Sequence, residues 1–239
     1  MAKQNGIILT GNYGGISYYL WKGIPCMRRA PGKRKVTGGS IHTSAIFGRA
    51  RKISSLLRSA LIPLLPQTGK RWLMYRMDSI VQRLLNDASE STAAFRQNVD
   101  AFHQFSLTEK SNFRQLFKKP IAIEWLHQGK AKVRVPACNP IEDIKAPAHT
   151  LSVNLCFMLL SCETSSGSLS SQVMHTLQLP FVEGNLPAHE FDLPYSELPS
   201  GLSVIAVSIR YSLKPGKQLP LNKELQWMPA MIAGGIIDL

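Results

Sequence analysis

The residues best suited to chemistry in this chain are cations, and they gather in its first third. The segment from Met1 to Met77 contains 14 Lys or Arg and no Asp or Glu, and the first acid is Asp78. Because no neighbouring carboxylate is available in this stretch, we expect these cations to face water or an external anion. The 239-residue chain has a formal net charge of +13, so its basicity is regional. This pattern favours nucleic acid or another polyanion as a partner, and it predicts no membrane partner.

A basic loop followed by a basic helix could bring nine of these cations to one phosphate-binding surface. Guanidinium groups suit two-point contacts with phosphate. Aromatic residues of the preceding strand could stack on bases or form an interface with another molecule. The candidate polyanion-binding residues are Arg28, Arg29, Lys33, Arg34, Lys35, Arg49, Arg51, Lys52 and Arg58. The candidate stacking or interface residues are Tyr18, Tyr19 and Trp21.

The same region allows a structural role as an alternative. An N-terminal hairpin of apolar and aromatic residues with exposed edges could add its strands to a neighbouring sheet. It would then bind a protein partner or build a homo-oligomer, and the cations would keep the surface soluble or meet acidic patches. The sequence leaves both functions open.

Recognisable catalytic and metal-binding motifs are missing from the sequence. Gly69-Lys70 is followed by Arg71, which does not fit a phosphate-binding P-loop. The segment His189-Glu190-Phe191-Asp192 groups ionisable residues, but no second ligand cluster stands at a metal-binding spacing from it. Cys26, Cys138, Cys156 and Cys162 form no CxxC pair. We therefore predict a non-enzymatic protein with free thiols, no cofactor and no metal.

The elements that must position the cations are a hairpin and a set of helices. Glycines separate β-branched and aromatic runs between Gly6 and Arg28, which predicts strands joined by turns at 11–15 and at Lys22-Gly23. A third short strand is expected at 24–27. Apolar residues at helical spacing predict a helix from an N-cap at Ser44 to the prolines at 63 and 66. Further helices are expected at 73–87 and 92–105.

Beyond Lys119 the apolar period changes from helical spacing to two, which is typical of strands. A hairpin is predicted over 121–135, and further strands over 150–162, 172–181, 202–213 and 227–237. The predicted fold class is α+β, with an N-terminal β hairpin and helical layer followed by a C-terminal antiparallel β-sandwich-like domain. The predicted domains are 1–43 (β hairpin and basic loop), 44–114 (helical segment) and 115–239 (antiparallel β domain).

The sequence shows neither a signal-peptide core nor a membrane span. The apolar run near the start, Ile7-Ile8-Leu9, is too short for a secretory signal. The longest apolar run, Leu155 to Leu160, is far too short to form a membrane-spanning helix. A cytoplasmic location is the expectation that follows.

Three segments of the chain carry a resemblance to a known family. They are Gly14-Gly15-Ile16-Ser17-Tyr18-Tyr19, Phe47-Gly48-Arg49-Ala50-Arg51-Lys52 and Arg96-Gln97-Asn98-Val99, and the resemblance continues from Val135-Pro136 to Pro147-Ala148-His149. Together they resemble an uncharacterised Bacteroidota protein family of unknown function, over residues 1–160. The resemblance implies a lineage and no particular activity.

Overall fold

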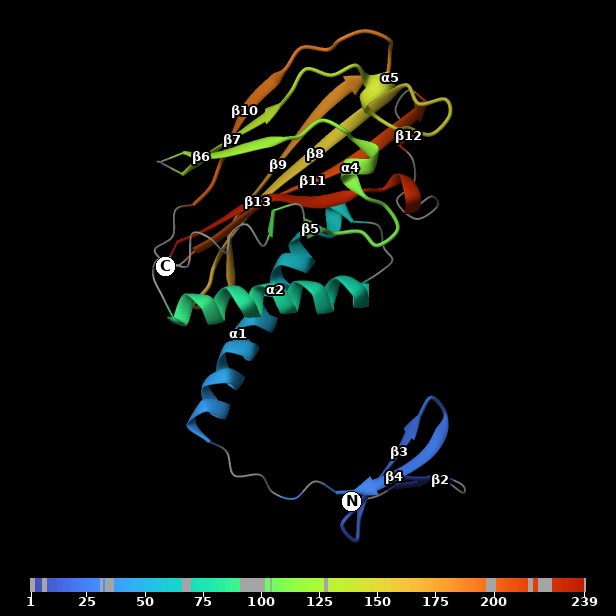
Figure 1. Cartoon of the computed structure of the whole chain (residues 1–239), viewed down its shortest axis with the longest axis vertical. Helices are drawn as coiled ribbons and strands as arrows, with labels where there is room; N and C mark the ends of the chain where they lie inside the picture. The colour runs from blue at the N-terminus through green and yellow to red at the C-terminus, as the bar shows by residue number, and fades with distance from the viewer. Residues whose placement is uncertain are drawn as a thin grey trace. The chain divides into compact units, whose positions relative to one another are not determined.

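Two compact units make up the chain, Met1–Thr43 and Ser44–Leu239 (Figure 1). The computed structural model describes residues 3–5, 8–30, 32, 37–65, 70–90, 102–103, 105–126, 129–196, 201–214, 217–218 and 225–238. We call the first unit the arm and the second the body.

The arm is a four-stranded antiparallel sheet in the order β1 (Lys3–Asn5), β2 (Ile8–Tyr13), β3 (Ile16–Trp21) and β4 (Ile24–Arg29). Two-residue turns join β2 to β3 at Gly14-Gly15 and β3 to β4 at Lys22-Gly23. All four turn residues have positive φ angles, +57° and +78° in the first turn and +50° and +84° in the second. This conformation matches the twist of hairpin strands and favours glycine. The predicted hairpin, the turn at Lys22-Gly23 and the third strand are confirmed. The turn expected over 11–15 is confined to Gly14-Gly15, because residues 11–13 pair with β3 as part of β2.

Two long helices pack in the body, and the first of them begins at the end of the arm. Helix α1 spans Gly38–Ala60, and α2 spans Lys70–Glu90. The expected N-cap at Ser44 is wrong, because α1 already begins at Gly38, where Thr37 Oγ1 accepts a hydrogen bond from the amide of Ser40 at 3.2 Å. The pair Gly38-Gly39, a poor helix former, hides this start in the sequence. A short 3-10 turn, η1 (Ile62–Leu64), follows α1 and contains Pro63, where the sequence predicts the helix to close.

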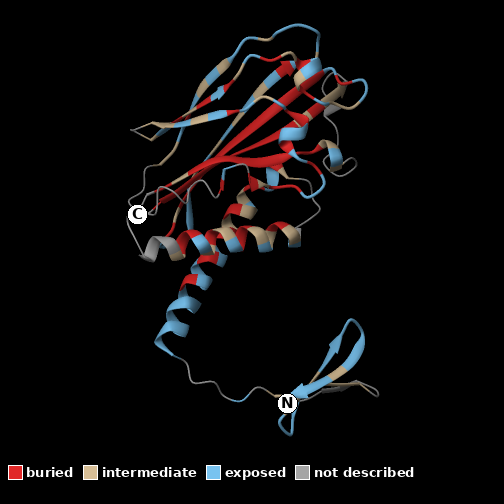
Figure 2. Ribbon diagram, viewed as in Figure 1, coloured by how far each residue is buried: buried red, intermediate tan, exposed pale blue. Residues whose placement is uncertain are grey.

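A six-stranded antiparallel sheet forms the centre of the body. Its order is β5 (Phe105–Ser106), β13 (Ala230–Asp238), β11 (Gly201–Lys214), β8 (Ser152–Glu163) and β9 (Ser168–Pro180), and β12 (Lys217–Gln218) also pairs with β11. Strands β8 and β11 are buried along nearly their whole described length, which explains their continuous apolar runs. Figure 2 shows this buried centre in red.

A smaller sheet covers one face of the central sheet, and the helices cover the other (Figure 1). The smaller sheet has the order β10 (His189–Pro194), β7 (Lys130–Val135) and β6 (Ala122–Leu126). Three short helical segments lie outside the sheets: α4 (Phe113–Leu116), α5 (Pro140–Asp143) and η3 (Leu225–Trp227). The expected α+β class with an antiparallel, sandwich-like β region is confirmed.

Two apolar cores result from these three layers. The helix-side core joins buried residues of both helices, such as Leu57 and Met77, to residues such as Met158 on the central sheet. The sheet-side core joins residues such as Val133 of the small sheet to Phe157 and Ile205 of the central sheet. Each large apolar side chain fully buried in this way stabilises the fold by about 1.5–3 kcal/mol. The helical and β segments of the body thus share the helix-side core.

The helix predicted at 92–105 can be compared with the structure only at its end. Most of the expected helix at 92–105 lies outside the described residues. Its last residue, Phe105, belongs to strand β5 and pairs with Ile232 of β13. The helical end of that prediction is therefore wrong. Phe102 and Phe105 both enter the helix-side core with rings 6.4 Å apart, so their apolar spacing reflects packing on the sheet.

Candidate nucleic-acid interface

The arm exposes residues that would be core in a larger domain. Among arm residues 8–30, 32 and 37–43, whose burial is described, none is buried. Exposed fractions reach 62% for Trp21, 71% for Met27 and 72% for Tyr13. A sheet without a buried side chain gains little stability from the removal of apolar surface from water. Its side chains are therefore open to a partner.

The strand register divides these side chains between two faces, because residues directly opposite each other on paired strands share a face. Tyr19 lies opposite Cys26, and Ser17 lies opposite Arg28. The first face, which we call the Tyr19 face, carries Ser17, Tyr19, Trp21, Ile24, Cys26 and Arg28. The second, the Tyr18 face, carries Tyr13, Ile16, Tyr18, Leu20, Met27 and Arg29.

The Tyr19 face combines a cation with two exposed aromatic rings. The guanidinium carbon of Arg28 lies 5.5 Å from the centroid of the Tyr19 ring. Such a cation–π contact at an exposed site is worth about 0.5–1 kcal/mol, which favours one placement of the guanidinium. Trp21 follows on the same face of β3. This arrangement offers flat stacking surfaces beside a positive charge.

The structure separates the arm candidates that the sequence grouped together. Tyr18 and Arg29 lie on the opposite face from Tyr19, Trp21 and Arg28. Lys33, Arg34 and Lys35 lie outside the described residues. Helix α1, in the body, carries Arg49, Arg51, Lys52 and Arg58.

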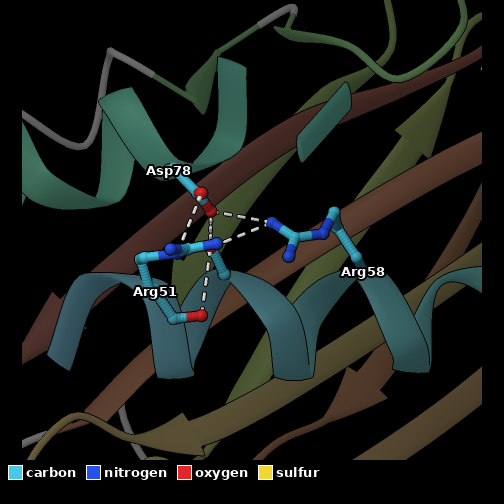
Figure 3. A network of polar contacts seen from close by, with 4 residues as sticks. Arg51, Arg58 and Asp78 are labelled. Atoms are coloured by element: carbon cyan, nitrogen blue, oxygen red, sulfur yellow. Dashed lines mark hydrogen bonds and ion pairs between the residues drawn. The ribbon is translucent and has the colours of Figure 1, made fainter. Parts of the chain in front are cut away.

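Two cations of α1 contact a carboxylate that lies just beyond the acid-free segment 1–77. Asp78 of α2 accepts a hydrogen bond from Arg58 Nη1 at 2.8 Å, and Arg51 Nε lies 3.7 Å from its other oxygen. Ser54 Oγ also donates to Asp78, and Arg58 Nη1 lies 3.0 Å from Ser54 Oγ (Figure 3). The expectation of no partner for these cations is therefore corrected. This network joins α1 to α2.

The other α1 cations differ from each other. Lys52 donates through its Nζ to the carbonyl oxygen of Ser166 at 2.5 Å, in the turn between β8 and β9. It therefore links the helix to the central sheet. Arg49 is exposed, and no ion pair joins Arg28, Arg29 or Arg49 to any described residue.

Sequence reasoning missed the roles of Asp78 and Arg76. Asp78 stands between Met77 and Val81 on the apolar stripe of α2, and an acid in that position signals an internal partner. Arg51, Ser54 and Arg58 stand at helical spacing on the facing helix. Arg76 places its guanidinium carbon 4.4 Å from the Trp72 ring centroid and 4.5 Å from that of Phe105. Desolvation by burial lowers the pKa of Arg76.

The remaining ionisable groups form no second site within the described residues. No group of three or more His, Cys, Asp or Glu side chains there is arranged to hold a metal. Glu190, from the segment singled out for its ionisable residues, forms an exposed ion pair of 2.9 Å with Arg134. Cys138, Cys156 and Cys162 are buried free thiols, and burial raises the pKa of Cys162 to about 12. Cys26 is partly exposed.

Comparison with known proteins adds no identity to these observations. The chain matches no protein-family model and none of the curated proteins. The resemblance to a Bacteroidota family therefore stays a prediction. Among the described helices, none combines the length and the apolar character that a membrane span requires.

Proposed function

We propose that this protein is a non-enzymatic binding protein whose arm contacts single-stranded nucleic acid through the Tyr19 face. The observation that carries the proposal is the Arg28 guanidinium over the exposed Tyr19 ring, with Trp21 on the same face. Stacking of a base on an aromatic side chain contributes about 1–3 kcal/mol and does not require a particular base. The guanidinium is suited to a phosphate next to the stacked base.

The charge distribution of the sequence supports the same partner. Five cations stand between Arg28 and Lys35, and no acid precedes Asp78. Such a segment attracts a polyanion over the Debye length and raises its association rate. Arg49 adds an exposed cation on α1, whereas Arg51, Lys52 and Arg58 have partners within the body. We therefore assign those three residues to the fold.

Binding to fluorescent single-stranded DNA, single-stranded RNA and duplex DNA tests the proposal. Anisotropy is measured with oligonucleotides of about 20 residues, over about 50 to about 500 mM salt. Trp21→Ala is expected to weaken single-strand binding about tenfold, through the loss of one stacked base. Arg28→Gln is expected to reduce the slope of log affinity against log salt by about 0.7.

The opposite face of the arm supplies matched controls. Met27→Ala removes an exposed apolar side chain, and Arg29→Gln removes the adjacent cation, but both lie on the Tyr18 face. They are expected to leave the stacking contribution intact. Absence of binding to all three nucleic acids at low salt would overturn the proposal. Equal losses in Trp21→Ala and Met27→Ala would show that the Tyr19 face has no special role.

The Tyr18 face favours a second candidate function, a protein-interaction or self-assembly module. Tyr13, Leu20 and Met27 expose 72%, 46% and 71% of their surface on this face. Thioether and aliphatic groups gain more from a protein partner than from phosphates. If this function holds, Met27→Ala will change the size of complexes in light scattering without changing single-strand affinity. Trp21→Ala will show the reverse.

A further inference from the structure

Strand β9 is a long edge of the central sheet. It comprises 13 residues, Ser168–Pro180, and pairs with β8 along its length. It is the last strand in the order of that sheet, and no described strand pairs with its other side. The opposite end of the sheet is the two-residue strand β5. The two ends of the sheet therefore differ sharply in length.

Most of β9 lacks the usual protections of an edge strand. Natural edges carry charges, internal prolines or bulges that discourage pairing with another chain. The segment Ser168–Pro180 contains no Asp, Glu, Lys or Arg, and its one proline is its last residue. Its register shift against β8 lies near its start, opposite Ser161 and Cys162. The stretch from residue 172 to residue 178 is thus regular, uncharged and free of proline.

The direction of the backbone groups along this stretch follows from one hydrogen bond. The amide of Phe181 donates to the carbonyl oxygen of Leu151 at 3.0 Å, so residue 181 directs its backbone towards the β8 side. Directions alternate along an antiparallel strand. The residues whose N–H and C=O groups point away from the sheet are therefore Gln172, Met174, Thr176 and Gln178. Pro180 belongs to the same set, so its missing N–H removes no bond to β8.

We propose that β9 pairs antiparallel with β9 of a second copy of this chain, which joins the two central sheets across a twofold axis. An axis at His175 places Gln172 opposite Gln178 and Met174 opposite Thr176, so all four outward residues find backbone partners. The His175 side chain is directed to the sheet-side face, where it stacks on Phe191 at 4.0 Å between ring centroids.

The composition of β9 favours a second copy over a different protein. An uncharged strand offers no complementary charge by which another partner would be selected. Self-pairing about His175 brings amide side chains opposite each other, Met174 opposite a threonine methyl and each His175 opposite its copy. No Asp, Glu, Lys or Arg lies opposite a like charge. An isologous contact of this kind closes at two copies.

Sedimentation of the full chain over about 1 to about 200 μM tests the proposal. Salt of about 0.5 M is used, because it screens repulsion between basic copies and weakens nucleic-acid contacts. A concentration-dependent dimer is expected. The double substitution Met174→Lys and Thr176→Lys adds charges to the pairing edge and should weaken the dimer at least tenfold.

Val182→Lys is the matched control for the added charge. Val182 lies just beyond β9 and is 52% exposed, close to the 48% of Met174, so it should leave the dimer intact. Tyr13→Ala with Met27→Ala should also leave it intact. Loss of the dimer in that arm variant would show that the arm, and not β9, joins the copies, and would overturn the proposal.

Hydrogen exchange of the unaltered protein keeps the test independent of variants. The amides of Gln172, Met174, Thr176 and Gln178 should exchange at least tenfold more slowly at high concentration than at low concentration. The amides of Val173 and Leu177, which face β8, should not change. A monomer at all concentrations, or equal exchange of the four amides at both extremes, would overturn the proposal. Nucleic-acid binding by the arm would be untouched by either result.

Discussion

The arm and the body use similar residues in opposite ways. In the body, apolar side chains fill two cores, and the largest, such as Phe157 and Leu57, are fully buried. In the arm, comparable side chains such as Trp21 and Ile24 each expose 62% of their surface. Apolar area stabilises a fold only when water is removed from it. The apolar residues of the body therefore stabilise its fold, whereas those of the arm stay largely in contact with water.

The cations of the two regions differ in the same way. Arg58 is held by Asp78, and Lys52 by the carbonyl of Ser166. Arg28 contacts only the ring of Tyr19 among the described polar and aromatic contacts. A count of acids along the sequence cannot separate these cases, because Asp78 reaches back from another helix. The availability of a cation depends on the fold around it.

The largest expected difference between the regions is in the free energy of unfolding. Phe157→Ala removes a ring that is fully buried and lies 5.1 Å from the Phe191 ring, so it should destabilise the body by about 3–5 kcal/mol. Trp21→Ala should change the stability by less than about 0.5 kcal/mol. Urea unfolding followed by circular dichroism measures both. A similar loss in the two variants would show that arm and body unfold as one cooperative unit.

A smaller effect is expected from the polar link between the helices. The side chain of Arg58 is only 20% exposed in its ion pair with Asp78. Asp78→Asn leaves this guanidinium without a charged acceptor and should destabilise the body by about 2 kcal/mol. Glu124→Gln is the control, because its ion pair with Arg134 is about half exposed and contributes little. The same urea titration compares them, and equal, small effects would mean that water replaces the Asp78 network without loss.

Local patterns allowed much of this fold to be predicted from sequence. The apolar period of two after Lys119 predicts strands of the body, and the glycines at 14, 15 and 23 predict the turns of the arm. Contacts distant in sequence were not predictable in this way. The pairing of Phe105 with Ile232 and the contact between Arg58 and Asp78 depend on how helices and strands pack. For the candidate site, the residue types were evident, but the division of Tyr18 and Tyr19 between two faces required the register.

The smallest expected effect concerns Gly→Ala substitutions, which should destabilise the arm but stabilise the body. Gly15 has a φ of +78°, and a Cβ added there meets nothing within 4 Å. Gly15→Ala therefore introduces backbone strain of about 1–2 kcal/mol without a clash. Gly48 lies exposed in α1, and a Cβ there also meets nothing within 4 Å. Gly48→Ala should stabilise the body by about 0.5–1 kcal/mol, because alanine favours the helix.

Two measurements separate these opposite effects. Gly15→Ala should speed hydrogen exchange of the arm amides and leave the urea midpoint of the body unchanged, whereas Gly48→Ala should raise that midpoint. Because a ligand must then also order a less stable arm, Gly15→Ala should weaken single-strand binding about fivefold, the equivalent of about 1 kcal/mol. Unchanged binding in the presence of faster arm exchange would show that the ligand does not need the folded sheet. The Tyr19 face would then lose its place in recognition, and the charge of the segment from Arg28 to Lys35 would be sufficient.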